Sequence, residues 1–181
     1  EKQKNWTKIK LFFDGYEGWI DSKQLQNISE NEFTELSNSE LIYNADLIEY
    51  VSNSSNLLIP IPLGSSLSFL NFESINHQNF EFEGLKATGI KSKESLLKTA
   101  FMYLNAPYLW GGVTPFGIDC SGFTQMVYKL NGYKLLRDAS QQATQGEALS
   151  FIEESEPGDL AFFDNDEGKI IHVGIIMSDN Y

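Results

Sequence analysis

The only cysteine of the chain, Cys120, lies where the residue pattern predicts the first turn of a helix. Asp119 precedes it and can cap the helix, and Gly132 can end it. Between them, apolar residues recur at the spacing of one helix face, at Phe123, Met126, Val127 and Leu130. The unpaired N–H groups at the start of a helix favour the thiolate, which is the nucleophilic form of a cysteine. The pattern therefore indicates a reactive cysteine, with a buried structural cysteine as the alternative.

His172 is the second candidate for chemistry. It lies in the apolar run 170–177, which we expect to form a strand buried on both faces. Alternation along a strand places His172 on the same face as Gly174. A polar ring in such a strand needs a partner, and the thiol of Cys120 would supply one. A hydrogen-bonded core histidine is the alternative, because only the fold can bring together two residues so far apart in the sequence.

Five sequence blocks between about Lys91 and Tyr181 resemble those of the NlpC-type cell-wall cysteine peptidases. They stand in the order of that family, at 108–112 (YLWGG), 119–123 (DCSGF), 137–142 (RDASQQ), 156–160 (EPGDL) with 162–163 (FF), and 172–174 (HVG). The resemblance implies a papain-like α+β domain in which helices pack on an antiparallel sheet. It places the cysteine at a helix N-terminus and the histidine on an adjacent strand, and it implies cleavage of bonds to D-glutamate in peptidoglycan peptides.

The N-terminal half resembles bacterial Src-homology-3-type (SH3-like) barrels, which are small and all-β. Residues 6–10 and 15–20 are similar to the closing strands of such a barrel, and the apolar runs of 41–89, broken by turn residues, indicate a second one. This layout resembles that of the γ-D-glutamyl-L-diamino acid endopeptidases, which act on short murein peptides. We therefore expect the C-terminal part of a first SH3-like barrel at 1–30, a linker and a second SH3-like barrel at 31–90, and an NlpC-type catalytic domain lacking its C-terminal end at 91–181.

Some local structure also follows from the sequence. Residues 27–40, rich in Ser, Asn and Glu, are expected to form a linker with one helical turn. Ser92 is expected to cap a helix that stops at 105–107, with core positions at Leu96, Leu97, Ala100, Phe101 and Leu104. We expect the side chains of Trp6 and Trp19 in barrel cores and His77 in a surface loop.

The family resemblance implies a thioester mechanism at Cys120. Its thiolate attacks the carbonyl on the γ-carbon of D-glutamate, and the oxyanion is held by the Cys120 backbone N–H and the Tyr108 hydroxyl. His172 then protonates the leaving amine and activates water. In the family a third polar residue orients the histidine from about a dozen positions further along the chain. We expect it beyond Tyr181, with Asp179 and Asn180 as alternatives.

The same resemblance implies a pocket for the free N-terminal amine of L-Ala-γ-D-Glu. Asp119 and Ser121 flank the nucleophile and match residues that recognise this amine, as does Tyr16 of the first barrel. Trp110 is expected to wall the site, and Ser140 is expected to hydrogen-bond the substrate backbone.

Each of these residues also has a purely structural interpretation. Asp119 and Ser121 can cap the helix, and the aromatic side chains of Tyr16 and Trp110 can fill the core. Arg137 is a candidate partner for the α-carboxylate of D-glutamate, and it can equally form an ion pair with Asp138 or another acid.

Composition narrows the class of partner. The 181 residues carry a formal net charge of −12, which argues against binding to nucleic acid or to anionic polymers. We therefore expect a murein peptide, L-Ala-γ-D-Glu-diamino acid. One cysteine excludes an internal disulfide, and no Cys/His cluster indicates zinc, so we expect no metal and no cofactor. No apolar run reaches the ~18 residues of a membrane span, and the first residues lack the apolar core of a signal peptide.

The sequence therefore favours a cysteine endopeptidase that cleaves the γ-D-glutamyl to diamino acid bond of free murein peptides with an N-terminal L-Ala. One alternative is a non-catalytic cell-wall binding module that holds peptidoglycan through its barrels, although the intact cysteine and histidine argue against it. Another is an amidase or acyltransferase on the same scaffold, since nucleophiles other than water can capture a thioester.

Overall fold

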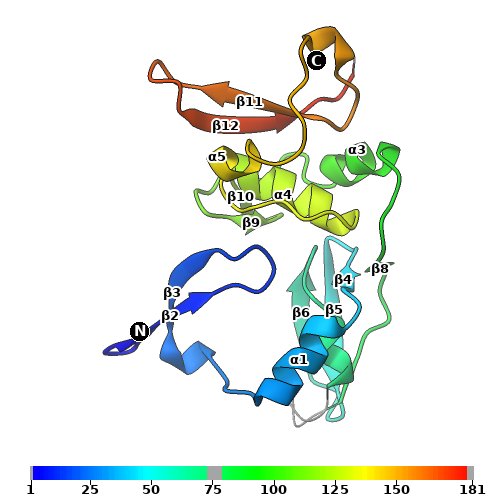
Figure 1. Cartoon of the computed structure of the whole chain (residues 1–181). Coiled ribbons are helices and arrows are strands. Elements are labelled where there is room, and N and C mark those ends of the chain that lie inside the picture. Colours follow the sequence, from blue (N-terminus) through cyan, green and yellow to red (C-terminus); the bar gives the residue numbers. More distant parts are fainter. Residues whose placement is uncertain (1, 73–78, 179–181) are drawn as a thin grey trace.

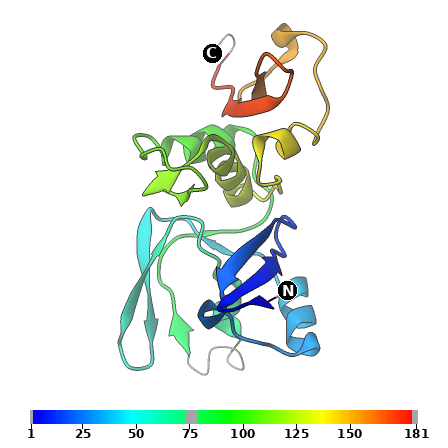
Figure 2. The ribbon, with the colours of Figure 1, turned by 90° about the vertical axis from the view of Figure 1, so that its left-hand side faces the viewer.

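The computed structural model describes residues 2–72 and 79–178, and it stacks them in layers (Figure 1). Short antiparallel strands of the N-terminal half lie on one side, the helices of the C-terminal half lie in the middle, and a strand pair lies beyond them. A view from the side shows the same order (Figure 2). Among the helices of the described residues, none combines the length and apolar character needed to cross a membrane.

The first sheet has the strand order β1-β2-β3 and is antiparallel, with Lys8 opposite Trp19. It consists of β1 (Lys2–Gln3), β2 (Trp6–Lys10) and β3 (Glu17–Asp21). Contrary to expectation, the side chains of Trp6 and Trp19 are 51% and 45% exposed. Strand alternation explains this, because it places both on the same face as Lys8, whereas Ile9 and Ile20 point to the half-buried face.

After the short 3-10 turn η1 (Ser22–Gln24), the chain forms the helix α1 (Glu30–Asn38). The expectation of a linker with one helical turn was therefore wrong for most of this tract. Its N-terminus is fixed by a capping box in which the Ser29 hydroxyl accepts the Glu32 N–H at 3.2 Å and Glu32 accepts the Ser29 N–H at 2.8 Å.

The following segment is built from short strands around the 3-10 turn η2 (Ser68–Asn71). One sheet has the order β6-β5-β7, and beside it β4 pairs with β8. Their bounds are β4 (Tyr43–Asn44), β5 (Ile48–Asn53), β6 (Leu58–Pro62), β7 (Phe80–Glu81) and β8 (Lys86–Ala87). All these pairings are antiparallel. They do not show closed barrels, so SH3-like barrels stay a prediction for the N-terminal half.

The C-terminal half mixes helices with antiparallel strand pairs. Its helical elements are α3 (Glu94–Phe101), α4 (Cys120–Leu130), α5 (Ala139–Gln142) and the 3-10 turn η3 (Ile152–Glu154). Its strands are β9 (Val113–Thr114), β10 (Gly117–Ile118), β11 (Leu160–Asp164) and β12 (Ile170–Ile175). β9 pairs with β10 across the short turn at 115–116, and β11 pairs with β12. This mixture of helices and antiparallel strands agrees with the expected papain-like catalytic domain.

The predicted helix after Asp119 is confirmed, and it forms the centre of the core. Met126, Val127 and Leu130 on α4 are buried, as the apolar spacing indicates. They share one cluster with residues of both halves of the chain, namely Tyr43, Leu63, Ala87, Leu96, Tyr103 and Ile118. The helix α4 therefore packs against the N-terminal strands as well as against α3.

The prediction of which side chains of α3 are buried is only partly correct. Leu96 is buried, but Phe101 and Leu104 are 57% and 67% exposed. The helix ends at Phe101, so the chain leaves the helical register there and Tyr103 is buried instead of Leu104. Ser92 is not the cap, because the helix begins after Lys93 without a side-chain cap.

Lys129 lies where the N-terminal half meets α4. Its Nζ donates to the carbonyl of Gly64 at 3.1 Å and lies 4.5 Å from the ring centroid of Tyr43 and 5.2 Å from that of Phe13. Burial lowers the pKa of Lys129 to about 8, and the charge of Asp14 opposes this shift only in part. The Lys129 ammonium thus connects α4 with the segments that contain Phe13, Tyr43 and Gly64, and it loses part of its hydration shell by burial.

This pKa predicts how stability changes with pH. Between about pH 8 and 10.5 the folded protein has released the Lys129 proton and the unfolded chain has kept it, so the free energy of unfolding should rise with pH in that window. We expect a rise on the order of 1 kcal/mol between pH 7 and 9.5 in urea unfolding. Lys129→Met should remove it, and the exposed Lys98→Met should not. Parallel curves for the wild type and Lys129→Met would contradict the assignment.

Candidate active site

Cys120 is the first residue of α4 and is half-buried. The N-cap is Asp119, whose Oδ1 accepts the Gly122 N–H at 2.6 Å. The carbonyl of Gly112, in the loop before β9, accepts the Asp119 N–H at 3.3 Å. A Cβ on Gly122 would lie 2.3 Å from that carbonyl oxygen, so only glycine fits there without a shift of the backbone. The cysteine therefore begins a helix whose first turn packs directly on the preceding loop.

His172 lies on β12, opposite Phe163 of β11, and their ring centroids are 5.7 Å apart. β12 packs against α4 and α5, so the elements that carry the histidine and the cysteine are neighbours. Among the described residues, no hydrogen bond joins the Cys120 and His172 side chains. The expectation of a strand buried on both faces was wrong, because Val173 is buried while Ile171 and His172 are exposed. Within the described residues β12 has β11 as its one partner strand, which leaves part of it uncovered.

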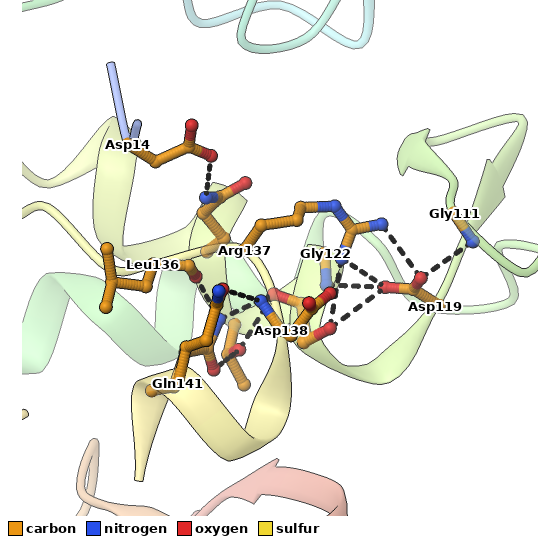
Figure 3. A network of polar contacts seen from close by, with 12 residues as sticks. Asp14, Gly111, Asp119, Gly122, Leu136, Arg137, Asp138 and Gln141 are labelled. Atoms are coloured by element: carbon orange, nitrogen blue, oxygen red, sulfur yellow. Dashed lines mark hydrogen bonds and ion pairs between the residues drawn. The ribbon is translucent and has the colours of Figure 1, made fainter. Parts of the chain in front are cut away.

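The Asp119 carboxylate also forms a largely buried ion pair (Figure 3). Arg137 donates from Nη1 to Oδ1 at 3.0 Å and from Nη2 to Oδ2 at 2.8 Å. The Gly111 N–H donates to Oδ2 at 2.7 Å, so both carboxylate oxygens have several donors. Arg137 Nη1 also donates to Ser121 Oγ at 3.0 Å. Of the two interpretations of Arg137, the structure shows an ion pair, and its partner is Asp119 rather than Asp138.

This network favours the charged state of both partners. Burial acts to raise the pKa of Asp119, but the hydrogen bonds from Arg137, Gly122 and Gly111 outweigh it, and the pKa is lowered. Burial likewise acts to lower the pKa of Arg137, and the hydrogen bond to Asp119 outweighs it and raises that pKa. The carboxylate next to the cysteine is therefore a fixed and neutralised charge.

A second buried network holds α4 against α5. Gln142 is 1% exposed, and its Nε2 donates to the carbonyls of Ser121 and Leu136, each at 2.9 Å. Its Oε1 accepts the Thr124 hydroxyl at 2.7 Å. Because two carbonyls face Nε2, the amide fits in one orientation only. Gln142 therefore fixes the carbonyl of the residue that directly follows Cys120.

The remaining candidate residues lie at the surface around this helix start. Tyr108 forms a parallel bridge with Ile118, two residues before the cysteine, and its side chain is 66% exposed. Trp110 is 86% exposed, so it does not fill the core. Tyr16 is 39% exposed and lies close enough to Arg137 that its ionised form raises the pKa of Arg137, and Ser140 is exposed on α5.

Three buried polar residues around the site were not predicted from the sequence. Thr124 and Gln125 on α4 and Gln142 on α5 are at most 5% exposed and hydrogen-bonded. No local signal in the sequence indicates their burial, because Thr124 and Gln125 lie off the helix face that Phe123, Met126, Val127 and Leu130 form. The described residues contain no group of three or more His, Cys, Asp or Glu side chains able to hold a metal ion. The alternatives for the orienting residue at 179–180, and His77, lie outside the described residues.

Comparison with known proteins gives consistent results. Residues 105–181 match the model of the NlpC/P60 family. A relative from Bacillus cereus, named gamma-D-glutamyl-L-lysine dipeptidyl-peptidase, is 30% identical over 99% of this chain and 61% of its own length. A protein of the same name from Bacillus subtilis is 29% identical over 90% of this chain and 57% of its own length. The chain thus spans less than two thirds of the length of these curated relatives.

The fold also has a counterpart of known structure. The crystal structure of an NlpC/P60 family protein from Bacillus cereus superposes with a TM-score of 0.83 at 26% sequence identity. The match covers 98% of this chain and 66% of that protein, and so it includes the N-terminal half.

The Gln142 network predicts a selective effect of a substitution that keeps its volume. Gln142→Met removes the hydrogen bonds that its amide makes with the carbonyls of Ser121 and Leu136 and with the Thr124 hydroxyl. We therefore expect a loss of about 1–3 kcal/mol in the free energy of unfolding and a changed rate of Cys120 alkylation by iodoacetamide. The matched control is Gln141→Met on the same helix, which removes an exposed hydrogen bond to the Asp138 N–H and should leave the alkylation rate unchanged. Urea unfolding and mass spectrometry measure the two effects, and equal behaviour of both variants would refute the role of Gln142.

Proposed function

Because residues 105–181 of this chain belong to the NlpC/P60 family of peptidases, we propose that the protein is a cysteine endopeptidase acting on free murein peptides. The proposed bond is that between the γ-carboxyl of D-glutamate and a diamino acid, in peptides that begin with L-Ala. The observation that carries the proposal is the single cysteine at the capped N-terminus of α4, in the part of the chain that matches the family. Two relatives named for the γ-D-glutamyl-L-lysine bond support L-lysine as the diamino acid.

In the proposed reaction the Cys120 thiolate adds to the carbonyl carbon of the γ-amide. The C–O π electrons move to oxygen, and the Cys120 N–H, which has no acceptor among the described residues, is a donor for this oxyanion. The Tyr108 hydroxyl is the second proposed donor. Collapse of the intermediate breaks the C–N bond, and His172 transfers a proton to the departing amine. His172 then takes a proton from water, and the hydroxide adds to the carbonyl carbon of the thioester. Cleavage of the C–S bond releases the γ-carboxyl group of D-glutamate and the Cys120 thiolate.

We propose that the substrate's N-terminal amine is recognised beside the nucleophile by Ser121 and Tyr16. The carboxylate of Asp119 already accepts hydrogen bonds from Gly111, Gly122 and Arg137, so its proposed part in amine recognition is to hold Ser121 in place. The remaining proposed contacts with the substrate come from Trp110 and Ser140, while Arg137 holds Asp119 and Ser121.

The test uses the full-length protein with two peptides, L-Ala-γ-D-Glu-L-Lys and its N-acetylated form. We expect release of L-Ala-D-Glu from the first peptide, little or none from the second, and loss of all detectable cleavage in Cys120→Ala. Mass spectrometry identifies the products. Full turnover by Cys120→Ala would exclude this nucleophile, and equal cleavage of the two peptides would exclude an amine pocket.

A further inference from the structure

The loop between β2 and β3 reaches the catalytic helix through one carboxylate. Asp14 Oδ2 accepts the Gln125 Nε2–H of α4 at 2.9 Å, and Asp14 Oδ1 accepts the backbone N–H of Tyr16 at 3.0 Å. Figure 3 shows the first of these bonds, with Asp14 directed at α4. A single side chain therefore connects the backbone of Tyr16 with the helix that begins at Cys120.

The loop has little freedom to move independently of Asp14. The Gly15 N–H donates to the Leu11 carbonyl at 3.0 Å, and the Leu11 N–H donates to the Tyr16 carbonyl at 2.9 Å. Gly15 has a φ of 75°, which glycine adopts without strain. These bonds close residues 11–16 into one tight turn, so the place of Tyr16 follows from the place of Asp14.

The partner of Asp14 on the helix is equally fixed. Gln125 is 5% exposed, and its Nε2 also donates to the carbonyl of Leu135 at 3.0 Å. Both hydrogens of this amide are therefore engaged, and a rotation of the amide would lose both bonds. The segment that begins with Leu135 continues to Arg137, which binds Ser121 and whose pKa the ionised form of the nearby Tyr16 raises.

A second contact seats the same loop one turn further along α4. Lys129, four residues after Gln125 and on the same helix face, lies over the ring of Phe13, the neighbour of Asp14. Lys134 lies over the rings of Phe12 and Phe13, at 5.6 Å and 5.8 Å. The loop thus packs through cation–π contacts on α4 and on the segment that follows it, and the bond between Asp14 and Gln125 sets its register.

We propose that Asp14 is a positioning residue that determines specificity, because it ties Tyr16 to the catalytic helix and so holds the phenol where the substrate's free amine must bind. The inference rests on the proposed function, since it assumes that Tyr16 contacts that amine. Asp14 itself touches no reacting atom. Its loss should therefore weaken the selection of the amine and leave the chemistry at Cys120 unchanged.

The variant Asp14→Asn separates the two bonds of this carboxylate. Its amide oxygen can still accept the Tyr16 N–H, but its NH₂ group then faces the NH₂ group of Gln125, so the tie to α4 is lost. Asp14→Ala removes both bonds. The matched control is Asp21→Asn, the same chemical change in the same sheet, at a carboxylate that accepts the Lys23 N–H.

The experiment measures kcat and KM for L-Ala-γ-D-Glu-L-Lys and for its N-acetylated form with all four proteins. For Asp14→Asn we expect KM for the free peptide to rise about tenfold with kcat within about twofold, and the preference for the free amine to fall by the same factor. Alkylation of Cys120 by iodoacetamide should keep its wild-type rate, which shows that the helix start is intact. Asp21→Asn should behave as the wild type.

The outcomes separate this inference from the proposed function. If the wild type prefers the free peptide and folded Asp14→Asn and Asp14→Ala keep that preference, the role of Asp14 is refuted and the proposed function stands. A fall in kcat and in the alkylation rate without a change in preference would show a general structural role and would also refute it. If the wild type cleaves neither peptide, the proposed function fails, and the inference that rests on it fails with it.

Discussion

The buried carboxylate of Asp119 is the constraint on which the candidate site depends. It accepts hydrogen bonds from the loop N–H of Gly111, from the helix N–H of Gly122 and from both Nη atoms of Arg137. A buried charge that loses such a partner costs several kcal/mol, so the loop, the helix start and the segment before α5 are stable only together. The place of Cys120 follows, because this residue adjoins the cap.

Polar side chains on α4 and on α5 hold α4 in place at separate points. Gln142 holds its first turn from the side of α5, and Gln125 and Lys129 receive the N-terminal half on another part of its surface. The apolar face between them fills the core. One helix of three turns thus carries the cysteine, much of the core and the contact with the loop that contains Tyr16.

Sequence reasoning was most successful where the signals are local. The helix at Cys120 has its cap, its apolar spacing and its stop within a few residues, and the structure reproduces all three. The capping box that starts α1 is also a local signal. The polar composition around Ser29 nevertheless led to the prediction of a linker instead of a helix. The exposure of His172 and the choice of Asp119 as the partner of Arg137 depend on which distant segments pack together, and no local pattern contains that information.

The common core has a consequence for how such proteins diversify. Tyr43 and Leu63 come from the strands, and Val127 and Leu130 come from the helix, yet they form one cluster. Recombination that exchanged only the N-terminal half for that of a distant homologue would replace one side of a close-packed contact and leave the other side unmatched. Substitutions on one side of this contact therefore require matching substitutions on the other side, unlike in domains that are joined only by a flexible linker.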